Sequence, residues 1–137
     1  MKTTPTETDR EAARLFEPAP GMRAWRTTGV GMMSDPGMVI EVDPATAPHG
    51  GIRTERGWSW LPVCAIDADD PATVGVMLAQ VEAMRPGQAV SIVDRLHSLP
   101  GDAERRFAVL VEHDGTQTVA TGPTRGAALV AARRACA

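Results

Sequence analysis

The stretch Asp67-Ala-Asp-Asp-Pro-Ala-Thr-Val-Gly-Val-Met-Leu-Ala-Gln-Val-Glu-Ala-Met84 has the start, the apolar face and the end of an amphipathic helix. Asp70 is suited to cap a helix whose first residue is Pro71, because proline lacks only an amide that would be unpaired there. The apolar side chains that recur at helical spacing are Val74, Met77, Leu78 and Val81. Arg85-Pro-Gly87 ends the element. These features determine architecture, and none of them specifies a chemical reaction.

Three strands and a second helix are expected after this helix. The strands are predicted over residues 88–96, 106–113 and 116–121, and Asp114-Gly115 is a strong hairpin signal between the last two. A final helix is capped by Thr121 or Thr124. The order α-β-β-β-α predicts an α+β fold, in which a three-stranded antiparallel sheet forms a two-layer unit with the helices.

The first half of the chain is expected to be a short helix followed by a small β-rich segment. The helix is predicted to run to Phe16 with Thr8 or Asp9 as its cap. Strands are predicted over residues 22–28, 38–42 and 57–63, with residues 43–56 as a loop. We therefore expect an N-terminal part, residues 1–63, and a core, residues 64–137, that pack as one compact unit.

Composition and charge argue for a folded, slightly acidic protein. The 137 residues carry 14 basic and 17 acidic side chains, and the formal net charge of −3 is spread evenly along the chain. There is no basic tail, which weighs against strong non-specific binding to nucleic acid. The N-terminus lacks the apolar run of a signal peptide, and no stretch approaches the roughly 18 apolar residues of a membrane span. We expect a location in the bacterial cytoplasm and no membrane partner.

The usual patterns of catalytic and cofactor sites are not met. Cys64 has no sequence context that would activate it as a nucleophile beside a histidine. The run Asp67 to Asp70 lacks the glycine and the distal glutamate of a calcium loop. Gly29-Val-Gly31 is too short for a dinucleotide loop. The histidines, His49, His97 and His113, have no metal-ligand spacing. We therefore predict no enzyme activity, no metal and no cofactor.

Two tryptophans and the acidic run form a candidate partner surface. Trp58 and Trp60 fall on the same side of the expected strand, and tryptophan supplies a large contact area with a polar handle. The candidate surface consists of Trp58, Trp60, Asp67, Asp69 and Asp70. The alternative is that the two indoles pack inside the protein, since their apolar area is costly to leave in water.

Three segments carry a resemblance to a known group of proteins. Trp60-Leu-Pro62, Asp69-Asp-Pro-Ala-Thr-Val-Gly75 and Thr124-Arg-Gly-Ala-Ala-Leu-Val-Ala-Ala132 together resemble small accessory proteins of tailed phages and prophages. The C-terminal half is similar in element order to the phage ABA-sandwich domain. The resemblance covers about residues 57–137, and Gly126 departs from it by placing a poor helix former in the first helical turn. It implies a phage or prophage accessory product and transfers no activity.

Two classes of function follow. The leading hypothesis is a non-enzymatic accessory protein that binds a host protein or a protein–nucleic-acid complex, with an anti-CRISPR-like inhibitor of host defence as its sharpest form. The alternative is a module that binds double-stranded nucleic acid, because α-β-β-β-α is also the order of double-stranded RNA-binding domains. Its candidate patch is Arg105, Arg106, Arg125, Arg133 and Arg134. Self-association into a homo-oligomer is a third possibility.

Overall fold

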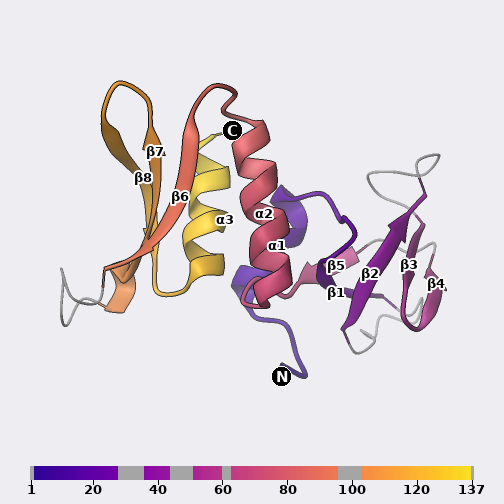
Figure 1. Ribbon diagram of the computed structural model, residues 1–137. Helices are drawn as coiled ribbons and strands as arrows, with labels where there is room; N and C mark the ends of the chain where they lie inside the picture. The colour runs from indigo at the N-terminus through magenta and orange to yellow at the C-terminus, as the bar shows by residue number, and fades with distance from the viewer. Residues whose placement is uncertain (1, 28–35, 44–50, 60–62, 96–102, 137) are drawn as a thin grey trace. The chain divides into compact units, whose positions relative to one another are not determined.

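The structure is a computed structural model that describes residues 2–27, 36–43, 51–59, 63–95 and 103–136. The chain divides into two compact units, Met1–Val76 and Met77–Ala137, and the helix α2 runs through the division (Figure 1). The expected division after residue 63 differs from this one, because the strand that follows residue 62 pairs with the N-terminal sheet.

The elements confirm an α+β fold with antiparallel sheets. The first unit contains α1 (Glu7–Leu15), β1 (Arg23–Arg26), β2 (Gly37–Val42), β3 (Ile52–Thr54), β4 (Gly57–Ser59), β5 (Val63–Ile66) and the first turns of α2 (Pro71–Ala83). The second unit contains the rest of α2, β6 (Ala89–Asp94), the 3₁₀ turn η1 (Ala103–Arg105), β7 (Phe107–Glu112), β8 (Thr116–Gly122) and α3 (Arg125–Ala135). The order α-β-β-β-α is thus the one expected for the C-terminal half.

The N-terminal sheet is curved. Its strands follow the order β4-β3-β2-β1-β5, so that β4 and β5 are its two edges. A flat sheet of five strands would separate its edges by about 19 Å. The four chain steps from Ser59 to Val63 span at most about 14 Å. Two β-bulges, one between Trp25 and Arg26 and one in β2 between Val39 and Glu41, supply the bending that brings the edges nearer.

The β-rich segment differs from expectation in two places. Residues 43–56 were expected to form a loop, yet β3 lies within them and forms a hairpin with β4. Gly57 supports this tight turn because its φ of 107° favours a residue without a side chain. Of the strand expected over residues 57–63, residues 60–62 lie outside the described ranges; residues 57–59 form β4, whereas Val63 belongs to β5, which pairs with β1.

The helix caps follow the rules of hydrogen bonding, with one shift of position. Thr6, and not Thr8 or Asp9, caps α1, and Asp9 completes a capping box by accepting the N–H of Thr6 at 2.9 Å. Asp70 caps α2 as expected, because its carboxylate accepts the N–H of Thr73 at 3.1 Å. Of the two caps expected for α3, Thr121 and Thr124, it is Thr124 whose side chain accepts the N–H of Ala127 at 3.0 Å.

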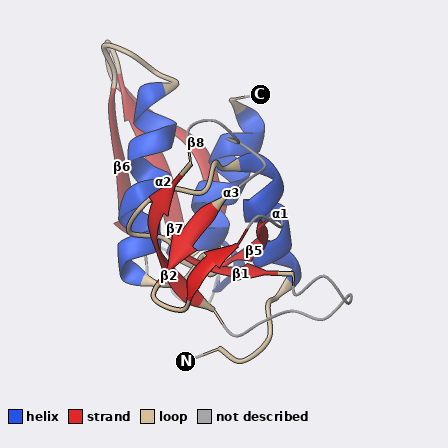
Figure 2. Ribbon diagram, turned by 90° about the vertical axis from the view of Figure 1, so that its right-hand side faces the viewer, coloured by secondary structure: helices blue, strands red, loops and turns tan. Residues whose placement is uncertain are grey.

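The C-terminal sheet has the order β6-β7-β8, and α3 packs against β7 and β8 (Figures 1 and 2). Phe107, Val109 and Val111 alternate along β7 and are all buried, as the pattern predicted. Asp114 and Gly115 both have positive φ in the turn between β7 and β8. Within the described segments, no helix has both the length and the apolar character that a membrane span needs.

Candidate functional site

The acidic run lies in the loop between β5 and α2, and its carboxylates are engaged within the first unit. Asp70 accepts both the N–H and the hydroxyl of Thr73, each at 3.1 Å. That hydroxyl in turn accepts the N–H of Arg23 at 2.8 Å, which connects the helix cap to the sheet. Asp67 is buried, and its carboxylate accepts the N–H of Asp69 at 3.4 Å. Two of the three carboxylates therefore serve structural roles.

Lys2 is the centre of an ion cluster that includes this run. Its Nζ lies 2.9 Å from Asp9 Oδ1, 2.8 Å from Asp69 Oδ2 and 3.3 Å from Asp67 Oδ1. Burial by itself lowers the pKa of Lys2, but the hydrogen bonds to Asp69 and Asp9 outweigh it, and the pKa lies above its usual value. The acidic run is thus compensated from within the unit.

A cavity of about 360 Å³ opens beside this cluster. It is lined by Lys2, Arg23, Asp67, Asp69 and Asp70. Its lining mixes two cations with three carboxylates, and the cations already contact carboxylates or carbonyls. Sequence reasoning missed Lys2, because a lysine in a polar N-terminal segment gives no sign of a partner more than 60 positions away.

Trp58 lies on the outer face of the N-terminal sheet. It is 45% exposed on β4 and stands directly opposite Arg53 on β3. Arg53 in turn stands opposite Glu41 on β2, and its Nε lies 3.3 Å from Glu41 Oε2. Ile40, the extra residue of the β2 bulge, is 44% exposed. We call Trp58, Arg53, Glu41 and Ile40 the outer-face row.

The structure separates the tryptophan from the acidic run. Figure 1 shows β4 at the far edge of the sheet from the start of α2, where Asp69 and Asp70 lie. Trp60 is outside the described residues, so the expected pairing of Trp58 with Trp60 is untested. Of the four described residues that were expected to share one surface, the structure brings together the three aspartates and places Trp58 apart from them.

The five arginines of the expected nucleic-acid patch fall into two groups. Arg106 and Arg125 share the ring of Phe107, with their guanidinium carbons 4.9 and 4.6 Å from its centroid. Arg105 ends η1 and directly precedes Arg106 in the chain. Arg133 and Arg134 lie in the last turn of α3, about 12 Å along the helix axis from Arg125.

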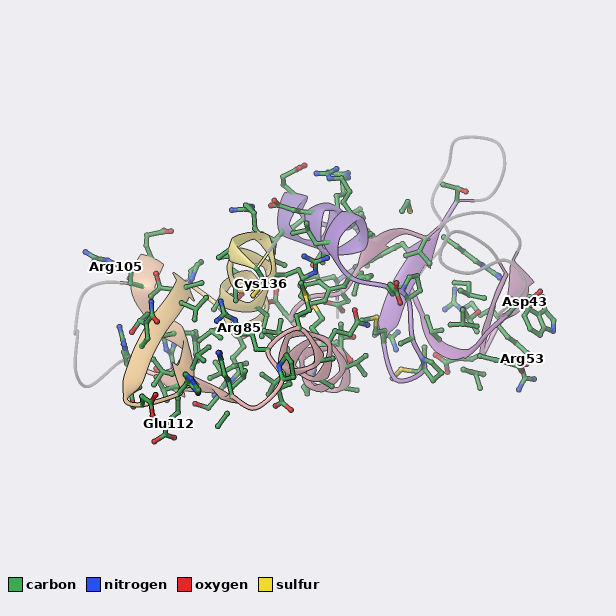
Figure 3. The ribbon with its side chains drawn as sticks, turned by 90° about the horizontal axis from the view of Figure 1, so that it is seen from above. Asp43, Arg53, Arg85, Arg105, Glu112 and Cys136 are labelled. Atoms are coloured by element: carbon green, nitrogen blue, oxygen red, sulfur yellow. The ribbon has the colours of Figure 1, made fainter. Side chains whose placement is uncertain are left out.

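The cysteines are held in place by hydrogen bonds, and neither is paired with the other. The Cys64 thiol donates to the carbonyl of Trp25 at 3.5 Å, and burial raises the pKa of Cys64. Arg85 Nε donates to Cys136 Sγ at 3.2 Å (Figure 3). His113 is exposed at the β7–β8 turn, whereas His49 and His97 are outside the described residues. In the described ranges, no group of three His, Cys, Asp or Glu side chains is arranged so that it could hold a metal ion.

No protein-family model, no curated protein and no solved structure matches this chain. The assignment of a function therefore depends on the residues and geometry of the two units.

Proposed function

We propose that the protein acts by binding another protein, and that the outer-face row is its contact surface with Trp58 as the anchor. The observation that supports this proposal is the 45% exposure of Trp58 in a unit that buries Trp25 almost completely. Tryptophan is enriched among the residues that dominate binding energy at interfaces, because one side chain supplies a large rigid contact.

The neighbours of Trp58 fit this role. Ile40 adds a second exposed apolar side chain to the row. The ion pair between Arg53 and Glu41 lies between them and supplies both signs of charge, so a partner can form directional contacts beside the anchor. Because the four residues are set by strand register and a bulge, they are presented on a rigid surface.

Binding is favoured over catalysis by the state of the one thiol near the N-terminal sheet. Nucleophilic catalysis by cysteine needs a thiolate, and the pKa of Cys64 is raised by burial. The neighbour that the thiol contacts is a backbone carbonyl and not a base. The proposal therefore assigns no reaction to the protein.

The resemblance to phage and prophage accessory proteins suggests where the partner is found. A bacterial host protein, or a host protein–nucleic-acid complex, is the proposed target, and inhibition of host defence in the manner of an anti-CRISPR is the most specific form of the proposal. This part rests on the resemblance of residues 57–137, and not on the geometry of the site.

The test is an affinity capture from bacterial lysate with three tagged proteins, each with and without nuclease. The proteins are the natural chain, Trp58→Ala, and Met84→Ala as a control that also removes an exposed apolar side chain. We expect one stoichiometric protein partner with the natural chain and the control, and at least roughly tenfold less with Trp58→Ala. Thermal melting of all three confirms that they are folded.

Two results would overturn the proposal. One is full capture of the partner by a folded Trp58→Ala protein, which would place the contact elsewhere. The other is loss of the partner after nuclease treatment, which would mean that nucleic acid bridges the two proteins. The anti-defence form has its own test, because expression of the protein in a CRISPR-immune host should restore phage plating. If the host stays immune, the anti-defence form of the proposal is rejected, and the capture experiment alone decides whether the protein binds a partner.

A further inference from the structure

Arginines from three segments gather at one end of the C-terminal sheet. Figure 1 shows that β6 ends, β7 begins and α3 begins at this end. The arginines of these segments are Arg95, Arg105, Arg106 and Arg125. The backbone joins two of them, because the N–H of Arg95 donates to the carbonyl of Arg106 at 2.6 Å. The described carboxylates in the same segments are Asp94 and Glu104, so positive charge is in excess.

The ring of Phe107 organises this cluster. It holds the guanidinium groups of Arg106 and Arg125 within 5 Å of its centroid, which keeps two like charges less than 10 Å apart. Arg106 is also fixed by Asp94, which accepts from its Nε at 3.1 Å and from its Nη2 at 3.0 Å. The two guanidinium groups are therefore oriented before any ligand arrives.

The charge of Arg125 is not compensated in the described part of the chain. Arg106 forms an ion pair with Asp94, whereas none of the described ion pairs involves Arg125. Arg125 is also the first residue of α3, where the helix dipole disfavours a cation. The Arg125 side chain is oriented by Phe107, is exposed, and lies at a helix N-terminus where a cation is disfavoured. It is therefore available to an external anion.

We propose that Arg105 and Arg125, with the Asp94-paired Arg106 and Arg95 beside them, bind backbone phosphates of double-stranded nucleic acid. The planar guanidinium fork matches a phosphate group in two parallel hydrogen bonds. The Phe107 ring is buried and already covered by arginines, so it offers no platform on which an unpaired base could stack. Recognition through phosphates alone reads the shape of a duplex and not its sequence. This inference is independent of the outer-face row.

The experiment measures fluorescence anisotropy of a labelled RNA duplex of about 20 base pairs, long enough for one domain-sized footprint. The full-length protein is compared with Arg105→Gln/Arg125→Gln and with Arg133→Gln/Arg134→Gln, a matched double that removes the same charge from the last turn of α3. We expect Arg105→Gln/Arg125→Gln to bind the duplex at least roughly tenfold more weakly, and to reduce the slope of log affinity against log salt concentration by about two. The affinity of the control should stay within about twofold of that of the natural chain.

Further arms identify the ligand. The single strand of the same sequence should bind more weakly than the duplex. Inorganic phosphate, a mononucleotide and poly-glutamate should not displace the labelled duplex when each is added at the same total concentration of negative charge as the duplex. The proposal is overturned if the two double variants lose affinity for the duplex equally, or if the single strand and the duplex bind equally well. It is also overturned if any of the three other anions competes, or if the protein does not bind the duplex at low salt. If melting shows the first double to be unfolded, Arg105→Gln alone should lower the slope by about one and Arg125→Lys should retain binding; failure of either overturns it.

Discussion

The fully buried carboxylate of Asp9 accepts a hydrogen bond at 3.0 Å from the N–H of Ala68, which lies 59 positions later in the chain. The same carboxylate caps the N–H of Thr6 and pairs with Lys2. One side chain thus joins the start of α1, the N-terminal segment and the loop before α2. Because Ala68 is fully buried and Lys2 is partly buried, removal of the carboxylate leaves a buried N–H and a cation without their acceptor.

Asp9→Ala is expected to lower the free energy of unfolding by about 3–5 kcal/mol, since it breaks a buried charge pair from one side. Urea denaturation followed by circular dichroism measures the loss. Glu7→Gln in the same helix is the matched control, because Glu7 is 75% exposed and its ion pairs contribute at most about 1 kcal/mol. Equal effects of the two substitutions would contradict the assigned role of Asp9.

The contribution of Lys2 to stability is expected to disappear in alkaline solution. The pKa of Lys2 is raised in the folded state, so folding binds its proton more tightly. The contribution is therefore complete below the usual lysine pKa of about 10.4 and decreases as the pH rises beyond it. Lys2 is the only lysine and the chain has no tyrosine, so few other groups titrate there.

The measurement is the difference in unfolding free energy between the natural chain and Lys2→Met as a function of pH. The difference should be constant near neutral pH and become smaller above about pH 10.4. Cysteine ionisation occurs in both proteins and cancels in the difference. A difference that grows with pH would show that the cluster does not hold the charged amine.

Gly122→Ala and Gly75→Ala should change stability in opposite directions. A Cβ at Gly122 would lie 2.6 Å from the backbone N of Ala128 and 2.9 Å from the carbonyl carbon of Ala127, so β8 and α3 would have to separate. The expected loss is about 1–3 kcal/mol. Gly75 is exposed in α2 with open space around it, and alanine there should add about 0.5–1 kcal/mol. Thermal denaturation of the two variants measures both changes in stability. Two losses of stability of equal size would contradict the close approach of β8 and α3 at Gly122.

Cys64 is expected to react more slowly with iodoacetamide at pH 8 than a small free thiol does. Burial raises its pKa, and the alkylation rate follows the fraction of thiolate. The measurement uses the Cys136→Ser protein, in which Cys64 is the only thiol. A rate equal to or above that of glutathione would contradict the raised pKa and would reopen a nucleophilic role for this residue.

Local sequence rules predicted the elements whose partners are close in the chain. The cap at Asp70, the turn at Asp114-Gly115 and the alternation along β7 were all evident, because each depends on residues within a few positions. The strand β3 was missed, since three residues are too few to show a period and their pairing with β2 is non-local.

The candidate sites were harder to predict for the same reason. The aspartates at 67 and 69 suggested an open surface, yet their partner Lys2 comes from the other end of the unit. The arginine patch was expected as one surface, and the length of α3 divides it. Nothing local distinguishes exposed Trp58 from buried Trp25, because exposure depends on which strands cover each indole.

The hydroxyl of Thr73, which connects Asp70 to the backbone of Arg23 across 50 positions, has a consequence for synthesis on the ribosome. The N-terminal unit is closed by contacts between its first and its last residues, so its fold cannot be completed until the start of α2 has left the ribosome. The C-terminal unit is built from neighbouring hairpins and can assemble as it emerges. Until the start of α2 has left the ribosome, a nascent chain therefore carries an open N-terminal sheet, and this unit is the one that chaperones are expected to meet.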